Sequence, residues 1–444
     1  MAAVNPGVYK DILRVRQAYP FDVACLLMRF FGSMLNIGVV TMMTLSGYSF
    51  FAAGLVSSTI ALSIFVVGPR VSKRIDERGQ TAVVPKAAAV ALTGLVILLA
   101  VVLAHGPVWP LFVGAVLVGF YPSPQAMARA RWTYLIRSGR LGSHAPELRT
   151  MFSYESVLDD MAFIFSPSIS IALAASVHPV AGMVAGGVAF VTGCLLLTLA
   201  RSTAPQPGWS EGASVEEEAG ALSEVEDAQL AASGDAPERS RRRSLFRTSS
   251  VVRVLFFIYL FMGSFLGLFD TATVSLAEDL HSPNVASVVL VMQGVMSMVA
   301  GFAFGMVRLR QPLAKQLAVA ATLVGCAFAT MFLIDSAVSL ALVGLAGAAT
   351  YAPLLIVANT VCEKAVPEER LTEAITWLGA GYTCGAAVGP SLGGAVIDAL
   401  GTLASFDVGA VLALGMPLTA LGCYRLVKRN LRQGYTMVEK RALK

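Results

Sequence analysis

The chain has 444 residues, of which 56% are hydrophobic and 14% are charged. Soluble globular domains carry a charge on about a quarter of their residues, so the composition excludes an ordinary soluble protein. The net charge of +5 does not indicate nucleic-acid binding, because the basic residues gather in the connections between apolar runs. The six cysteines are scattered without a metal-binding or redox spacing, and we expect neither a metal site nor a cofactor.

Apolar runs of about 20 residues, the length that a helix needs to cross a bilayer, recur along the chain. They predict an all-α polytopic membrane protein with twelve transmembrane helices in two pseudo-symmetric six-helix bundles. The predicted spans are 22–45, 48–69, 83–104, 107–127, 151–176, 180–200, 251–276, 284–306, 315–335, 337–361, 372–397 and 402–425. The N-terminal segment lacks the features of a signal peptide, so the first run is expected to be a mature span.

Lysine and arginine are distributed unevenly between alternate connections. The outer connections contain neither residue, whereas the N-terminal segment, the inner connections, the central linker and the C-terminal tail are rich in them. By the positive-inside rule, this separation predicts a multi-pass protein of the cell membrane with both termini in the cytoplasm.

The same pattern divides the chain into four parts. Residues 1–200 are predicted to form the N-terminal bundle and residues 251–430 the C-terminal bundle, followed by a cytoplasmic tail over 431–444. Residues 201–250 form a cytoplasmic linker, acidic at first and then basic, whose low hydrophobicity and high charge predict disorder. The basic run either contacts anionic lipid at the inner leaflet or serves only as a topology anchor.

Three carboxylates stand at the start of the fifth apolar run, in the stretch Tyr154–Pro167. Glu155 and Asp159 are four residues apart and share a helix face, whereas Asp160 points in another direction. Carboxylates at a hydrocarbon boundary need a partner, a proton or a water-filled cavity. Arg29 lies at a matching depth in the first span, so an Arg29–Asp159 or Arg29–Glu155 pair could couple protonation to conformation.

A second interpretation of these residues is open. Residues 161–177 alone are long enough to span a membrane, so the three acids could instead form a cytoplasmic extension at the N-terminus of the helix. Arg29 could then extend its side chain toward the inner surface. In either case Arg29, Ser33 and Asn36 share one helix face and form a polar stripe.

The connection between the second and third spans reads SKRIDERGQ over residues 72–80. It is similar to the signature GxLADRxGRR of the major facilitator superfamily, which it matches at Asp76 and Gly79 and departs from at three other positions. With its two six-helix halves and inner linker, the chain resembles this superfamily. The resemblance implies secondary transport by alternating access, with Asp76 acting as a conformational latch against the inner end of the eleventh helix.

A second motif occurs in the eleventh span. Residues 385–394 fit GxxxGPxxGG, a pattern of the drug/proton antiporters of the superfamily, where it belongs to the fifth helix. The motif consists of Gly385, Gly389, Pro390, Gly393 and Gly394. Runs of small residues let helices approach closely, so the motif indicates either tight helix packing or a part in antiport. The sequence RARW at Arg129–Trp132 also looks like members of the superfamily.

In the superfamily the first, fourth, seventh and tenth helices line the substrate cavity. By position, the resemblance nominates Asn36, Gln125, Asp270, Tyr351 and Asn359. Gln293 is a further polar residue near the middle of the eighth span. Asp270 lies toward the outer face, where it could serve an outer gate or proton entry, or could simply be solvated.

No metalloprotease, Walker or serine-hydrolase motif occurs in the chain, so we expect no enzyme and no direct use of ATP. We expect a proton-coupled exporter of small organic or amphipathic compounds that contacts membrane lipid and functions as a monomer, as members of the superfamily often do. Two alternatives are proton-coupled uptake of a nutrient or metabolite on the same scaffold and a non-transporting membrane sensor. The sequence does not separate export from uptake.

Overall fold

The computed structural model describes residues 15–138, 140–141, 148–207, 245–282, 284–307, 311–366 and 370–431. Within these ranges all regular structure is helical. Eleven helices are long and apolar enough to cross a membrane, and the shorter apolar helix Trp109–Val118 belongs to the remaining crossing. The prediction of an all-α membrane protein with twelve crossings is therefore confirmed.

The first half contains α2 (Tyr19–Leu45), α3 (Phe50–Arg78), α4 (Gln80–Leu103), α5 (Trp109–Val118), α6 (Pro124–Arg137), α7 (Leu148–Ser176), α8 (Ala181–Leu199) and the 3-10 turn η2 (Arg201–Thr203). The second half contains α11 (Leu245–Thr248), α12 (Ser250–Asp279), α13 (Asn284–Met306), α14 (Leu313–Ala329), η3 (Thr330–Leu333), α15 (Ala337–Ala365), α16 (Leu371–Leu400) and α17 (Thr402–Gly422). The predicted disorder of the linker and the predicted tail fall mostly on residues outside the described ranges.

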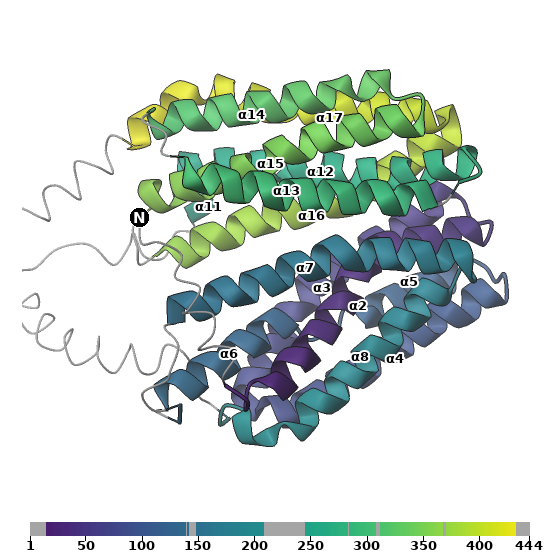
Figure 1. Ribbon diagram of the computed structural model, residues 1–444, viewed down its shortest axis with the longest axis vertical. Helices are drawn as coiled ribbons and strands as arrows, with labels where there is room; N and C mark the ends of the chain where they lie inside the picture. The colour runs from purple at the N-terminus through teal and green to yellow at the C-terminus, as the bar shows by residue number, and fades with distance from the viewer. Residues whose placement is uncertain are drawn as a thin grey trace, which may run out of the picture.

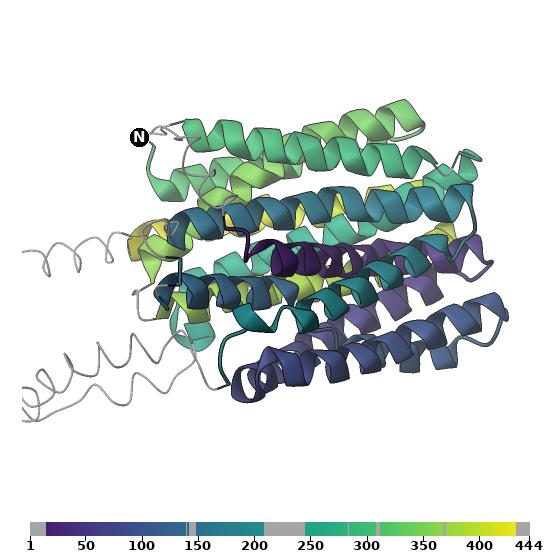
Figure 2. The same ribbon diagram turned by 60° about the horizontal axis from the view of Figure 1, so that its bottom comes forward.

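The helix ends define two sides of the molecule. At one side α8 ends and α12 begins, and we call this the linker side. The short connections after α2, α4 and α12 lie at the opposite end, which we call the far side. Figure 1 shows the linker side at the left and the far side at the right, and Figure 2 shows that the helices of both halves run along one common direction.

The fourth crossing differs from its prediction. A single span over 107–127 was expected, but α5 ends at Val118 and α6 begins at Pro124 and continues to Arg137. The break follows from the sequence Pro122-Ser123-Pro124, because proline cannot continue a helix but fits its first turn. Ser123 caps the new helix by accepting a hydrogen bond from the Ala126 N–H at 3.4 Å.

Each half has a hydrophobic core of its own. One cluster of buried residues runs from Val15 to Leu197 and the other from Leu245 to Leu431. A third, small cluster joins the halves through Ile37 and Ile171 on one side and Val274, Ala277 and Ala286 on the other. The two bundles are thus separate packing units that meet at a limited surface.

The contacts between the halves concentrate toward the far side. There α3 packs against α16, with Gly54 against the backbone of Pro390, and Thr44 on α2 donates a 2.7 Å hydrogen bond to Glu278 on α12. Ser287 on α13 donates a 2.7 Å hydrogen bond to the carbonyl of Ser168 on α7. In Figure 1 the ribbons of α7 and α13 lie further apart at the linker side than at the far side.

Candidate functional site

A buried ionic cluster joins α2 to α7 in the first half. One guanidinium nitrogen of Arg29, Nη2, donates a hydrogen bond to Oε2 of Glu155, and Nε lies 2.8 Å from Oδ1 of Asp159. The side chains of Arg29 and Glu155 are 1% and 0% exposed, whereas that of Asp159 is 25% exposed. The structure thus brings Arg29 together with both acids, and only Asp159 retains substantial access to solvent.

This arrangement does not favour the second interpretation of the sequence, in which Arg29 and the acids reach solvent. An arginine that extended its side chain to the membrane surface would be exposed, but Arg29 is buried. A cytoplasmic extension would leave Glu155 solvated, but Glu155 is fully buried and α7 is continuous through this region. Burial of ionised groups is costly unless they are paired, which is why the two side chains lie against each other.

Helix α6 contributes a second cation to the cluster. Arg129 donates a 3.2 Å hydrogen bond to Oδ2 of Asp159, so that carboxylate lies between two guanidinium groups. Gln125, one turn earlier on α6, lies beside Asp159. The sequence analysis nominated Gln125 but missed Arg129, because it ended the fourth span at residue 127. The RARW motif was the available signal.

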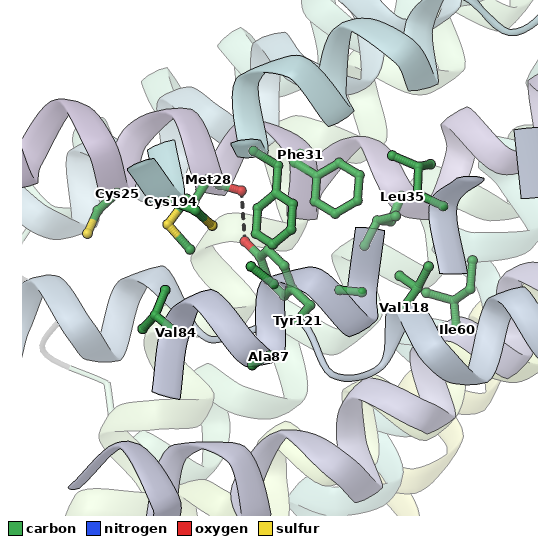
Figure 3. Packing of buried hydrophobic residues seen from close by; sticks show 14 of the residues in the cluster. Cys25, Met28, Phe31, Leu35, Ile60, Val84, Ala87, Val118, Tyr121 and Cys194 are labelled. Atoms are coloured by element: carbon green, nitrogen blue, oxygen red, sulfur yellow. Dashed lines mark hydrogen bonds between the residues drawn. The ribbon is translucent and has the colours of Figure 1, made fainter. Parts of the chain in front are cut away.

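Aromatic packing holds α2 beside the break in the fourth crossing. Tyr121, which lies in the break, donates a 2.8 Å hydrogen bond to the carbonyl of Met28, one residue before Arg29. Its ring packs with that of Phe31 at a centroid distance of 5.8 Å (Figure 3). It also packs with the ring of Phe190 at 5.5 Å. Gly32 leaves room for the tyrosine, since a Cβ there would collide with its hydroxyl group. These contacts fix the depth of Arg29.

A further buried carboxylate, Asp22, was not recognised in the sequence. It is 6% exposed and accepts a 2.9 Å hydrogen bond from the indole nitrogen of Trp132 on α6. The two residues are 110 positions apart, so no local pattern could reveal the contact. Trp132 is fully buried and packs edge-on against Phe21.

Arg131 is a buried cation with neutral partners. Its guanidinium donates hydrogen bonds to the side chain of Gln80 at 2.7 Å and to the carbonyls of Leu197 and Ala200 at 3.0 and 2.6 Å. Cations are stabilised at the C-terminus of a helix, and both carbonyls belong to the end of α8. Arg131 therefore connects α6 to α4 and α8, whereas Arg129, two residues earlier, pairs with Asp159 in the ionic cluster.

Asp160, Asp270 and Tyr351 lie nearer to the boundary between the halves. Asp160 is exposed on α7, and Tyr351 on α15 lies within electrostatic range of both Asp160 and Asp270. Asp270 is half-buried on α12, nine residues before the helix ends at Asp279, so it is not in a solvated loop. Tyr351 also lies beside Ser297 on α13.

The remaining cavity candidates do not join these groups. Asn36 accepts a 2.6 Å hydrogen bond from Ser57 on α3. Gln293 packs against Gly344 on α15, and Asn359 accepts a 3.0 Å hydrogen bond from Tyr259 on α12. Each of these contacts lies within one half of the molecule.

The two sequence motifs occupy defined places in the fold. Gly79 has a φ of +85° and joins α3 directly to α4, which explains the requirement for glycine, and Asp76 is exposed near the end of α3. In the second motif, Gly385 and Gly389 lie against the backbone of α12, and Gly394 lies against that of α3. Pro390 contacts Gly267 of α12, and Gly393 contacts Leu268.

No group of three or more His, Cys, Asp or Glu side chains that could hold a metal ion occurs among the described residues. A cavity of about 440 Å³ lies within the second half between α13, α14 and α15. It is separate from the ionic cluster, which belongs to the first half.

Comparison with known proteins places this geometry in context. Residues 255–434 match the model of the Major Facilitator Superfamily. No curated protein matches the chain. The fold matches that of the nucleoside transporter NupG with a TM-score of 0.67 at 12% identity, covering 93% of this chain and 99% of the other.

Two further solved structures share the fold. A bacterial homologue of the iron transporter ferroportin, in an inward-facing state, is 15% identical with a TM-score of 0.62, covering 91% of this chain and 99% of the other. A structure of proton-dependent oligopeptide transporters is 15% identical with a TM-score of 0.57, covering 95% and 99%. The second half of the chain is thus similar to the Major Facilitator Superfamily, and the whole chain shares the fold of these solved transporters.

Proposed function

We propose that the protein is a secondary active transporter that exports small organic or amphipathic compounds in exchange for protons. The observation that carries this proposal is the buried cluster in which Asp159 lies between Arg29 and Arg129. Ionisable groups within a membrane-spanning segment are costly to maintain and are characteristic of ion and substrate pathways. A solved structure of this fold is of proton-dependent transporters.

The cluster offers a simple coupling step. Asp159 is the more accessible of the two acids, so a proton would reach it before Glu155. Protonation would remove its charge, weaken both of its arginine contacts and leave Arg29 paired with Glu155 alone. Because Arg29, Asp159 and Arg129 belong to three different helices, this exchange of partners would alter how α2, α6 and α7 pack.

Alternating access requires the halves to separate at each side in turn. In the present conformation the contacts between the halves concentrate at the far side. We propose that this is the state whose substrate cleft opens at the linker side. The distribution of lysine and arginine supports a cytoplasmic linker side, with both termini cytoplasmic in the cell membrane.

The polar residues near the boundary between the halves favour a neutral or cationic cargo. Asp160 and Asp270 come from opposite halves and both lie within electrostatic range of Tyr351. No lysine or arginine forms an ion pair with either acid within the described ranges. A polyanionic cargo would require paired cations instead. The two halves together supply every residue of the proposed site, so we propose a functional monomer.

The test is transport into proteoliposomes under an imposed pH gradient, with a panel of amphipathic compounds that first shift the melting temperature of the purified protein. Asp159→Asn should reduce gradient-driven transport at least tenfold, because the residue can no longer exchange a proton. Exchange of cargo without a gradient should continue, since the fold and the proposed cargo residues are retained. Asp335→Asn is the control for loss of a carboxylate outside the cluster and the proposed cargo site, since Asp335 is exposed and bonds Ser339 within its own half.

Equal gradient-driven transport by wild type, Asp159→Asn and Arg29→Ala would contradict the coupling proposal. Uptake of a nutrient or metabolite is the alternative on the same scaffold, and solved structures of this fold include nucleoside and peptide transporters. Accumulation in cells separates the two directions. An uncoupler should raise the internal cargo concentration if the protein exports and lower it if the protein imports.

A further inference from the structure

The N-terminus of α3 is bound by a residue from the other half of the molecule. Asp398, near the end of α16, accepts hydrogen bonds from the backbone N–H of Phe50 at 3.1 Å and from that of Phe51 at 2.8 Å. Each carboxylate oxygen accepts one of the two bonds. The contact lies at the far side, where α3 begins and α16 ends.

These hydrogen bonds satisfy backbone N–H groups at the start of α3 that have no acceptor within the helix. The first N–H groups of a helix have no partner within the helix. Ser49 caps α3 but accepts only from the Ala52 N–H, at 3.2 Å, which leaves the two preceding groups to Asp398. A carboxylate at this position also interacts favourably with the positive end of the helix dipole.

The carboxylate lies above a close contact between the two helices. Gly54 lies against the carbonyl of Pro390, and Gly394 lies against that of Phe50. One turn deeper, the Ser58 hydroxyl lies 2.5 Å from that of Ser391. Small residues permit this approach, so the carboxylate and the packing beneath it close the same edge of the interface between the halves.

The end of α16 repeats the local structure found at the end of α3. In both helices an aspartate, Asp398 or Asp76, precedes by three positions a glycine with positive φ. These glycines are Gly401, with φ +91°, and Gly79, with φ +85°. Each glycine ends one helix and begins the next without an intervening loop. The helices α3 and α16 are antiparallel, so the two aspartates stand at opposite sides of the molecule.

We propose that Asp398 is a latch that holds the two halves together at the far side and must release α3 when that side opens. The inference rests on the proposed alternating-access function. The aspartate binds backbone N–H groups and not a side chain, so the latch depends on the position of α3 and on no particular residue type at positions 50 and 51. Its release exposes the start of α3 and the apolar contact of Ile37 and Ile171 with α12 and α13.

Hydrogen–deuterium exchange on the full chain in lipid nanodiscs tests this latch. Asp398→Asn keeps the shape of the side chain but loses its charge, and Asp398→Ala loses both acceptors. Asp335→Asn is the matched control, since Asp335 is also an exposed far-side aspartate but bonds Ser339 within its own half. Exchange is compared in peptides that contain the contacts between the halves, around Ile37, Ile171 and Ala286.

If Asp398 holds the two halves together, exchange in these peptides should rise roughly twofold to fivefold in Asp398→Ala, as expected for loss of an exposed charge at a helix terminus. Asp398→Asn should show a smaller rise, and Asp335→Asn none. Faster exchange confined to residues 50–53, or no change anywhere, would overturn the proposal, because the carboxylate would then be only a local cap. The measurement uses neither cargo nor a pH gradient, so it can fail independently of the proposed proton-coupled export.

Discussion

The two halves of the molecule bury different kinds of polar residues. Among the described residues, the fully buried charged side chains are Asp22, Arg29, Arg131 and Glu155, all in the first half. The buried polar residues of the second half all carry hydroxyl groups. This difference separates the two similar bundles: the first buries charged side chains, as the proposed ionic switching requires, and the second buries only uncharged polar groups at close helix contacts.

The packing of the second half supports this division. The most extensive contact between two of its helices joins α12 and α16. Glycines line this contact on both helices, with Gly263 and Gly267 opposite Gly385 and Gly389. Backbones in direct contact have few side-chain rotamers to rearrange, so the pair is suited to move as a unit. In the first half, by contrast, charged side chains from α2, α6 and α7 contact one another, so the proposed exchange of partners would alter how these three helices pack.

The largest effect that would test this division is expected at Arg29. Arg29→Ala leaves the buried carboxylate of Glu155 without its cation, and loss of one member of a buried ion pair costs about 3–5 kcal/mol. We expect the free energy of unfolding to fall by that amount, measured by denaturation in detergent.

The double variant Arg29→Ala/Glu155→Gln is the matched control for Arg29→Ala. It removes both charges, and it should regain a large part of the stability because no unpaired buried ion is left. If Arg29→Ala were as stable as wild type, the ion pair would contribute nothing to the free energy of unfolding. The contrast between the two halves would then lose its basis.

In the second half, the largest effect is expected from added volume and not from lost charge. Gly385→Ala places a Cβ against the carbonyl of Leu260 on α12, so the two helices must separate. We expect a loss of about 2–3 kcal/mol in the free energy of unfolding. Gly379→Ala on the same helix is the control, since a Cβ there meets nothing within 4 Å. Equal stability of the two variants would show that α12 and α16 are not closely packed.

A smaller effect should separate charge from hydrogen bonding at Asp22. Trp132→Phe removes the indole N–H that donates a hydrogen bond to Asp22. It should lower the free energy of unfolding by about 1–2 kcal/mol. Asp22→Asn keeps an acceptor oxygen for Trp132, so its cost should stay below about 1 kcal/mol. Thermal unfolding of both variants measures the difference. A larger loss in Asp22→Asn than in Trp132→Phe would mean that the charge of Asp22 is itself required.

Features that depend on regular helix geometry could be predicted from the sequence. The number of crossings followed from the lengths of the apolar runs. The proximity of Arg29 to Glu155 and Asp159 followed from their depths, because the rise per residue in a helix is constant. The spacing of four between the two acids correctly indicated a shared face, and Arg29 contacts both.

Features that depend on the path of the chain between helices could not be predicted in the same way. The resumption of the fourth helix at Pro124 was missed, although Ser123-Pro124 is a favourable helix start, because the predicted span ran unbroken through both prolines and ended at residue 127. For the same reason the sequence analysis missed two contacts made by α6, that of Arg129 with Asp159 and that of Trp132 with Asp22. The contact of Asp398 with α3 depends on how the halves dock, and no local pattern encodes it.

The interruption of the fourth crossing has a mechanical consequence. Regular helix stops at Val118 and resumes at Pro124, so residues 119–123 form a joint about which α6 would turn relative to α5. Arg129 and Trp132 are less than one turn apart on α6 and contact different helices, α7 and α2. A rotation of α6 would therefore weaken both contacts together. Neutralisation of the Asp159 carboxylate would then affect the packing of α2 and α7 at the same time.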